Sequence, residues 1–517
     1  MLFCWMQTHA QDSKNGSTMR SVDIGVALTK GRTFYDPTSQ SYKIVGAGQY
    51  SDLNREDLHF HFRKMGGDFL LTADFSFSND NGLQMKKMGW MVRESLRDDA
   101  AHIAAVRQGD GTVYMQRRSI RGAYIRDAED RIFSPKKGLQ TIQIERKGNI
   151  LSMRAASPGE PLQDVGSMTM EHLPDSVAVG VFFCSQDARL PDSADVWNLR
   201  IDKPVPDIYH PNPSVRRKTR QAQPTLGSRL ETMDVLDGRR YIVRESKGRF
   251  EAPNWMPDGK RLLYNESGYL YTIPVKGGMA ERLNTGRADR NNNDHGISFD
   301  GKWLAISHHR EGLPGGGSTV YVLPVEGGEP RMVNGNTPSY WHGWAPDGKN
   351  VVVVGQRNGS SIYNIYKVDV KTGQETDLTG NTKGHVDGCE YSPDGKYIYY
   401  NANPTGTMQI WRMKPDGSGK EQVTFDEYNN WFPHLSPDGR WIAFISFPTD
   451  IDPDSHPSYK KVMLRLMPAS GGAPRVIAHL YGGQGTLNVN SWSPDSRRIS
   501  FVSNSEANTT VASSMER

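Results

Sequence analysis

Cysteine is scarce in this chain of 517 residues, which contains only Cys4, Cys184 and Cys389. Three cysteines so far apart provide neither a disulfide framework nor a Cys-x-x-Cys metal site. An excess of one charge is also missing, because 62 lysines and arginines nearly balance 58 acidic residues. Nucleic-acid binding needs a concentrated basic surface, so the sequence predicts no nucleic-acid partner.

Long hydrophobic runs are absent as well. A membrane-spanning helix needs about 18 or more consecutive apolar residues, so no membrane span is predicted. The first twelve residues look like the tail of a secretory signal, although a basic region before the apolar part is missing. We therefore expect residues 1–30 to be either a signal remnant or a disordered N-terminus. A signal remnant favours a periplasmic or secreted location.

A four-residue turn motif of the Ser-Pro-Asp-Gly type dominates the second half of the chain. Proline presets φ, aspartate bonds its own backbone and glycine takes a positive φ, so the motif predicts a tight turn. Its aspartates recur at intervals of 42, 47, 47, 44 and 57 residues, and strand-like runs follow them. This period is typical of β-propeller blades. The six copies begin at Met256, Ser298, Ala345, Ser392, Ser436 and Ser493.

The spacing predicts a six-bladed propeller over residues 229–505. The last copy of the motif is followed by too few strands for a whole blade, whereas a strand–turn–strand pattern at 229–245 precedes the first copy. We expect this N-terminal pair to complete the last blade and so leave no unpaired edge. Residues 506–517 are predicted to be a frayed tail.

The first half of the chain lacks the turn motif but has many short strand-like runs. They recur about every ten residues over 31–202 without helical periodicity, which predicts a β-sandwich. A proline-rich linker follows at residues 203–228. The whole chain is therefore predicted to be all-β, with a sandwich followed by a propeller.

Two family resemblances fit this division. Leu58-His59-Phe60, Gly67-Asp68-Phe69 and the run Gly89–Ser95 resemble the concanavalin-like jelly rolls of the DUF1349 type. That likeness implies a lectin-like fold and glycan contact. The turn-motif repeats resemble the WD40-like, or TolB-type (PD40), propellers. TolB has an N-terminal α/β domain instead of a sandwich, so a role in the Tol system is not implied.

Two other propeller families resemble the repeats less closely. Prolyl oligopeptidases pair a similar propeller with a hydrolase domain, but its Gly-x-Ser-x-Gly elbow is absent, so peptidase chemistry is not implied. Oligogalacturonate lyases carry a histidine-rich metal site in the propeller funnel. The ligand pattern of that site is not reproduced in this chain.

Polar residues just ahead of the turn motifs are the first candidates for a site. The innermost strand of a blade precedes the motif, so residues two to five places ahead of it approach the central channel. They could be solvated channel residues, ligand-binding groups or a metal or catalytic site. Imidazoles and carboxylates suit a divalent metal, for which His295, His342, Glu390 and His434 are the candidate ligands; no cofactor is certain. The channel candidates are Asn254, Asp294, His295, His342, Asp387, Glu390, His434 and Asn490.

Aromatic and amide residues near these positions extend the candidate site. Trp344 and Trp431 combine ring faces with polar neighbours, as sugar binding requires, although propellers also pack such rings between blades. Gln484 and Asn488 lie in a glycine-rich stretch that allows close approach of a ligand. An insert at residues 447–457 is predicted to be a loop over one mouth of the propeller.

These features leave three functions open. The leading hypothesis is a non-catalytic protein that binds a glycan or an envelope protein. The alternative is a metal-assisted polysaccharide lyase or glycoside hydrolase with its site in the funnel, and the third possibility is a scaffold for protein contacts. Because propellers host many functions, fold alone cannot decide whether the protein is an enzyme. The oligomeric state is not predicted.

Overall fold

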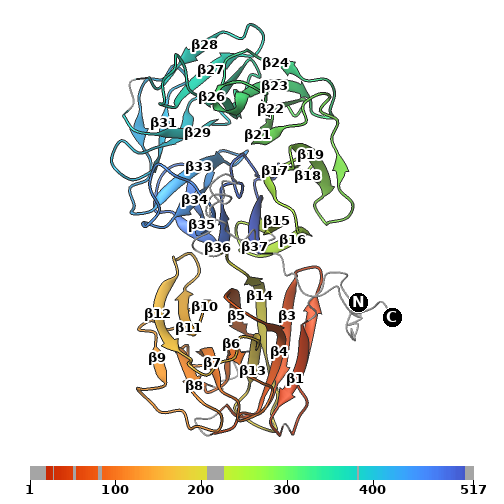
Figure 1. Cartoon of the computed structure of the whole chain (residues 1–517), viewed down its shortest axis with the longest axis vertical. Coiled ribbons are helices and arrows are strands. Elements are labelled where there is room, and N and C mark those ends of the chain that lie inside the picture. The colour runs from red at the N-terminus through yellow and green to blue at the C-terminus, as the bar shows by residue number, and fades with distance from the viewer. Residues whose placement is uncertain are drawn as a thin grey trace. The chain divides into compact units, whose positions relative to one another are not determined.

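The chain forms two compact units, the first built from strands β1 to β14 and the second from β15 to β37 (Figure 1). The computed structural model describes residues 19–26, 28–50, 54–79, 84–205, 226–380 and 383–506. Much of the predicted N-terminal segment, most of the linker and nearly all of the tail lie outside these ranges. Within them, no helix is long and apolar enough to cross a membrane.

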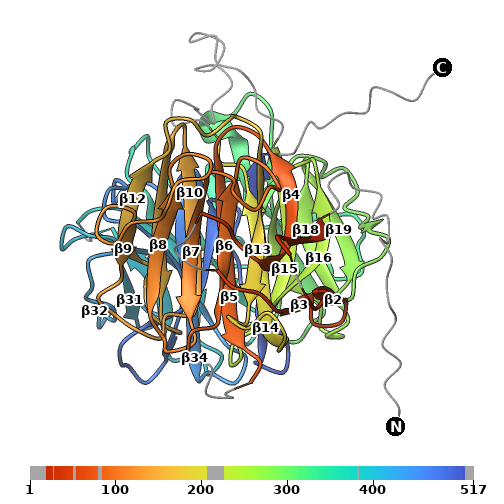
Figure 2. The same cartoon turned by 90° about the horizontal axis from the view of Figure 1, so that it is seen from below.

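The first unit contains two seven-stranded antiparallel sheets. Figure 2 shows β4, β13, β6, β7, β8 and β9 of one sheet side by side. In spatial order this sheet contains β1 (Arg20–Ile24), β4 (Leu58–Met65), β13 (Val177–Cys184), β6 (Lys87–Arg93), β7 (His102–Gln108), β8 (Val113–Arg118) and β9 (Arg131–Phe133). The other contains β12 (Gln163–Thr169), β11 (Ile150–Ala156), β10 (Thr141–Lys147), β5 (Phe69–Phe77), β14 (Asp192–Asp202), β3 (Ser41–Gly46) and β2 (Arg32–Asp36).

A continuous apolar core joins the two sheets. Trp90 of β6 and Ile103 of β7 pack in one cluster with Leu71 of β5 and Ile144 of β10. The indole nitrogen of Trp90 also donates a hydrogen bond across the core to the carbonyl oxygen of Ile142, at 3.0 Å. The two large sheets are thus those of an all-β unit, while its likeness to concanavalin-like domains stays a prediction.

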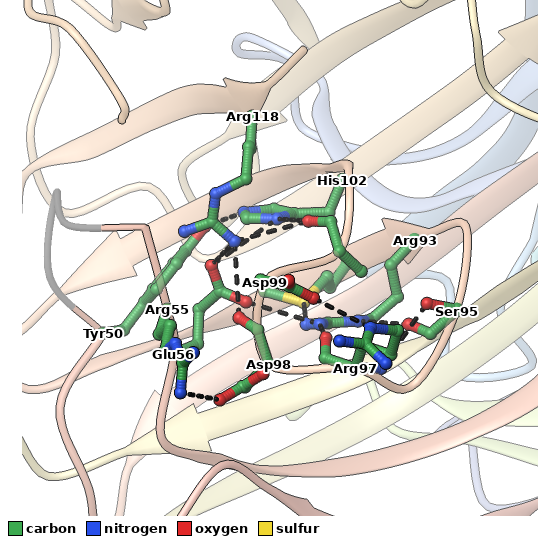
Figure 3. A network of polar contacts seen from close by, with 12 residues as sticks. Tyr50, Arg55, Glu56, Arg93, Ser95, Arg97, Asp98, Asp99, His102 and Arg118 are labelled. Carbon is green, nitrogen blue, oxygen red and sulfur yellow. Dashed lines mark hydrogen bonds and ion pairs between the residues drawn. The ribbon is translucent and has the colours of Figure 1, made fainter. Parts of the chain in front are cut away.

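A second feature of this unit is a buried ionic network around Glu56 (Figure 3). The Glu56 carboxylate lies 3.3 Å from Nη2 of Arg93, forms an ion pair with Arg118 and lies 3.7 Å from Nδ1 of His102. The side chains of all four residues are fully buried. The hydroxyl of Tyr50 lies 2.7 Å from the other ring nitrogen of His102. The network therefore fastens the segment before β4 to β6, β7 and β8.

The second unit is a six-bladed propeller, as the sequence predicts. Five blades are four-stranded antiparallel sheets, and the sixth contains three strands. The four-stranded blades are β17 (Phe250–Trp255), β18 (Arg261–Glu266), β19 (Tyr269–Pro274) and β20 (Glu281–Arg282); β21 (Asn291–Ile297), β22 (Trp303–His309), β23 (Ser318–Pro324) and β24 (Arg331–Met332); β25 (Ser339–Trp344), β26 (Asn350–Gly355), β27 (Asn364–Asp369) and β28 (Glu375–Asp377); β29 (Val386–Tyr391), β30 (Ile398–Ala402), β31 (Gln409–Met413) and β32 (Glu421–Gln422); and β33 (Asn429–Leu435), β34 (Trp441–Phe447), β35 (Ser458–Pro468) and β36 (Arg475–Gly483). A short 3-10 helix, η1 (Pro314–Gly317), precedes β23.

The three-stranded blade joins the two ends of the propeller. It contains β16 (Arg240–Ser246), β15 (Leu226–Asp234) and β37 (Arg498–Glu506) in that order. The central strand β15 pairs with β37 from Leu226↔Glu506 to Asp234↔Arg498. A single bridge between Trp492 and Ile499 continues this blade inwards. The ring is therefore closed by strands from both ends of the unit.

The turn motifs have the geometry that their composition predicts. In the fifth copy the hydroxyl of Ser436 donates to Asp438 at 2.6 Å, and the same carboxylate accepts the amide of Arg440 at 3.0 Å. Gly439 has a φ of 70° and donates its amide to the Ser436 carbonyl at 2.8 Å. Each motif thereby ends an innermost strand abruptly and starts the next strand of the blade.

Candidate functional site

Irregular pairing of the innermost strands shapes the central channel. In all five four-stranded blades the register between the first two strands shifts once, as at Asp387/Glu390 and Trp431/His434. Ala252, Gly388 and Phe432 have positive φ values at these shifts. A bulge bends a strand and redirects its side chains. These bulges explain how residues only three apart can line different parts of the channel.

The channel contains two pockets with very different linings. We call the first the motif-side pocket, because residues of the turn motifs line it; its volume is about 470 Å³. We call the second the histidine pocket; its volume is about 410 Å³. His342 belongs to both linings. The histidine pocket is lined by Asn292, Asn293, Asp294, His309, Tyr340, His342, Val354, Tyr363, His385, Asp387, Phe432, His456, Gln484 and Asn488.

Asp387 of β29 is the centre of the histidine pocket. Its Oδ1 lies 3.0 Å from Nε2 of His342, and its Oδ2 lies 3.9 Å from Nε2 of His385 and 3.7 Å from Nε2 of His456. His456 comes from the insert between β34 and β35. Three imidazoles from three segments of the chain therefore surround one carboxylate.

These contacts set the protonation of the cluster. Burial alone would raise the pKa of Asp387, but the hydrogen bond from His342 and the nearby imidazole of His385 outweigh it and hold that pKa well below its usual range. Burial likewise opposes protonation of His342, yet the hydrogen bond and charge of Asp387 raise its pKa. The pair is therefore favoured in its charged form.

Asp294 of β21 is the second carboxyl group of this pocket, and its protonation differs from that of Asp387. Burial raises the pKa of Asp294 to about 7, although His342 acts in the opposite direction. The charges of Asp387 and Glu251 raise that pKa further. One pocket thus contains a carboxylate and a carboxyl group that is half protonated near neutral pH.

Rings form one wall of the histidine pocket. Phe432 stacks on His342 with the ring centroids 6.2 Å apart, and Tyr340 and Tyr363 are neighbours with centroids 6.2 Å apart. Trp431 lies behind the pocket, 4.5 Å from His456 and 5.6 Å from His385 between ring centroids. Trp431 itself is fully buried, so its ring supports the imidazoles and offers no open face to a sugar.

The motif-side pocket is aromatic. The residue directly before the turn motif points into it in five of the six repeats. Prolines of the motifs and the indole of Trp341 add to the lining. The Trp341 ring lies so close to Gly296 that a Cβ there would approach it to 2.1 Å. The five pre-motif residues are Trp255, Ile297, Trp344, Leu435 and Trp492.

The polar groups of the motif-side pocket are largely paired with one another. Glu390 accepts a hydrogen bond from Asn490 at 2.7 Å, and its other oxygen lies 2.7 Å from Nδ1 of His434. Asn254 donates to the backbone carbonyl of Asn490 at 2.7 Å. Because the second ring nitrogen of His434 lies 3.1 Å from the carbonyl of Leu487, this histidine is held on both sides.

The predicted metal ligands are distributed over different contacts. The imidazole of His342 pairs with the carboxylate of Asp387, whereas the imidazole of His434 pairs with the carboxylate of Glu390. His295 lines neither pocket, and burial lowers its pKa to about 4. Among the residues that the structure describes, no group of three or more histidine, cysteine or acidic side chains is arranged to hold a metal ion.

Apart from Trp431, which lies behind the histidine pocket, the other predicted residues line one pocket or the other. Asp294, Gln484 and Asn488 line the histidine pocket, and Asn254, Trp344 and Asn490 line the motif-side pocket. Sequence reasoning missed Tyr363, His385, His456, Trp255 and Trp492. The two tryptophans had a readable signal, because they occupy the pre-motif position of their repeats. His456 had none, since an insert of irregular structure carries it.

Comparison with known proteins identifies the propeller. Residues 316–452 match the family model described as the TolB beta propeller domain. The uncharacterized protein Atu1656 of Agrobacterium fabrum is 44% identical over 279 residues, which are 54% of this chain and 92% of that protein. A solved structure of a proposed TolB from Agrobacterium tumefaciens is 43% identical, covers 54% of this chain and 98% of that chain, and has a TM-score of 0.51.

A shorter match extends to a named Tol protein. TolB of the Tol-Pal system of Anaeromyxobacter dehalogenans is 30% identical over 83 residues, 16% of this chain and 18% of that protein. The fold and these similarities define the second unit as a TolB-type β-propeller. The chain therefore belongs to the family of TolB-like propeller proteins.

Proposed function

We propose that this protein binds a carbohydrate in the histidine pocket of its propeller. The observation that carries the proposal is a cavity of about 410 Å³ whose lining combines hydroxyl, amide, carboxylate and imidazole groups with aromatic rings. Sugars offer hydroxyl groups at their edges and CH groups on their faces, and such a lining can satisfy both. A few polar groups in a concave pocket are also the usual basis of small-ligand recognition.

Two further observations support a glycan partner outside the cell interior. The sequence of the first unit predicts a lectin-like domain, and 83 residues of the chain are 30% identical to a TolB of the Tol-Pal system. A periplasmic or secreted location and contact with an envelope protein are parts of the same proposal.

A glycan array followed by titration tests the proposal. The full chain should bind at least one class of oligosaccharide, and Asp387→Asn or Gln484→Ala should weaken that binding about tenfold. The first removes the charge around which three histidines are placed, and the second removes a hydrogen-bonding amide from the pocket. Glu311→Gln is the control, since Glu311 is exposed and lines neither pocket. Binding that survives both pocket changes, or an array with no bound glycan, would contradict it.

The second candidate is acid–base chemistry on a bound sugar. It is favoured by the opposite pKa shifts of Asp294, raised to about 7, and Asp387, held well below its usual range. Two carboxyl groups with opposite protonation are what a general acid and a general base require. The test is to incubate the protein with an oligosaccharide found on the array and to analyse the products by mass spectrometry. Shortened or unsaturated products that are absent with Asp294→Asn support catalysis, and an unchanged oligosaccharide rejects it.

A further inference from the structure

The histidine pocket contains acidic side chains and histidines but no strongly basic side chain in the part of the chain that the structure describes. Its lining contains two aspartates and four histidines but no lysine and no arginine among the described residues. Guanidinium and ammonium groups are the usual partners of carboxylate and phosphate ligands in proteins. A pocket without them is poorly suited to an acidic sugar such as a uronate. The lining therefore favours a neutral or a positively charged ligand.

The histidines are mostly engaged with Asp387. His342 lies 3.0 Å from its carboxylate, and His385 and His456 approach the same group within 4 Å. The fourth, His309, has its Nδ1 2.9 Å from the backbone carbonyl of Gly316. Three of the four histidines are thus already close to the Asp387 carboxylate.

Asp294 has a hydrogen bond from the Asn292 side chain, but no ion pair with a cation among the described residues. Its side chain is buried, and the charged groups that face it are His342 from β25, Asp387 from β29 and Glu251 from β17. Tyr340 and Cys389 are the other titratable neighbours. His342, the one cation of this set, is hydrogen-bonded to Asp387. A buried carboxylate without a counterion is costly, so ionised Asp294 is suited to pair with a cation brought by the ligand.

We propose that the sugar bound in the histidine pocket carries a free amino group, whose ammonium form pairs with the Asp294 carboxylate. This rests on the proposed function, because it specifies the class of carbohydrate that the same pocket binds. The lining also contains the amides of Asn292 and Asn488 and the hydroxyl of Tyr340. The raised pKa of empty Asp294 fits this role, since a bound ammonium ion would supply the missing charge.

Two matched trisaccharides test the proposal by isothermal titration of the full chain. The glucosamine trimer carries free amines, and its N-acetylated form has the same sugar backbone without the charges. We expect the glucosamine trimer to bind at least about tenfold more tightly, as a charge-assisted hydrogen bond to a buried carboxylate should give. A galacturonate trimer, which is acidic, should bind more weakly than both.

Proton release gives a second readout in the same titration. At pH 6.5 more than half of Asp294 is protonated, because its pKa is about 7. Pairing with an ammonium ion favours the carboxylate, so binding of the glucosamine trimer should release protons and that of the N-acetylated trimer should not. The difference is measured by repeating the titration in buffers with different ionisation enthalpies.

The variant Asp294→Asn should abolish the preference between the two trimers while binding of the N-acetylated trimer persists. Asp289→Asn is the matched control, since Asp289 lies near the same blade, is exposed and lines neither pocket. Binding of the N-acetylated trimer also shows that a variant is folded. The comparison of trimers on the unchanged protein needs no variant at all.

The possible outcomes separate this inference from the proposed function. Equal or tighter binding of the N-acetylated trimer overturns the amino-group assignment but leaves carbohydrate binding intact. If spermidine binds as tightly as the glucosamine trimer, the pocket recognises an amine and the assignment of a sugar is overturned. If Mn²⁺ or Ca²⁺ binds tightly and displaces the trimer, the partner of Asp294 is a metal ion and the assignment of an amino group is overturned. If the array and both trimers show no binding, the proposed function and this inference fail together.

Discussion

At the scale of the residue, both units contain buried charged side chains, and the partners of these side chains differ. Asp387 is surrounded by imidazoles, and Asp294 is not. Glu56 in the first unit lies between two arginines. Burial of a charge is tolerated only where a partner compensates it, so each of these residues predicts a different response to mutation or pH.

Asp294→Asn should stabilise the protein at high pH. Its pKa is raised from 3.8 to about 7 in the folded state, so the folded protein binds the proton more tightly than the unfolded chain does. The free energy of unfolding therefore falls as pH rises between about 4 and 7, and the loss is complete above 7. We expect the free energy of unfolding of the variant to lack about 2–4 kcal/mol of this decrease. Urea unfolding at pH 5 and pH 8 measures it, and equal pH dependence in both proteins would contradict it.

Glu56→Ala should destabilise the first unit by about 3–5 kcal/mol, because it leaves Arg93 and Arg118 buried without their carboxylate. Urea unfolding followed by amide hydrogen exchange in β6, β7 and β8 reports on this unit. Glu129→Ala is the control, since Glu129 pairs with Arg126 at the surface and should contribute less than about 1 kcal/mol. Equal midpoints for the two variants would show that the network contributes little.

Gly296→Ala should distort the motif-side pocket. The added Cβ would lie 2.1 Å from the Trp341 ring, so the indole or the backbone must move, at a cost of about 1–3 kcal/mol. Gly335→Ala is the matched control, because nothing lies within 4 Å of a Cβ at that position. The melting temperatures of the two variants decide: a similar value for both would contradict the close contact.

At the scale of the element, the innermost strands combine a regular repeat with an irregular register. The turn motif could be recognised in the sequence. It predicted where the innermost strand of each blade ends and that the ring has six blades. The residues two to five places ahead of the motif include Asp294, His342 and Asp387 of the histidine pocket. That part of the candidate site was predictable because the motif fixes the end of each innermost strand.

The remainder of the site could not be predicted from the sequence. Bulges such as that at Asp387/Glu390 decide which pocket a side chain faces, and no local pattern announces them. His385 lies one residue before its strand, and His456 lies in the insert, so neither obeys the offset from a motif. The four predicted metal ligands were also chosen by their offset from the motif, and His342 pairs with Asp387 while His434 pairs with Glu390.

At the scale of the whole molecule, the propeller should depend on its last strand. A chain that ends at Arg497 lacks β37 and leaves the hairpin of β15 and β16 unpaired on one edge. We expect this truncation to aggregate or to lose cooperative unfolding of the propeller, because an open sheet edge invites association. A chain that ends at Glu506 keeps every pair of β37 and is the control. A truncation at Arg497 that unfolds like the control would contradict this dependence.

The antiparallel closure also determines how the propeller bears tension. Leu226, where β15 begins, lies opposite Glu506, where β37 ends, so the chain enters and leaves the ring at the same end of one strand pair. A force that separates these two points loads the pair one hydrogen-bonded rung at a time instead of shearing all rungs together. The ring should therefore open at a low force when its two ends are pulled apart, because the hydrogen bonds between β15 and β37 break one after another.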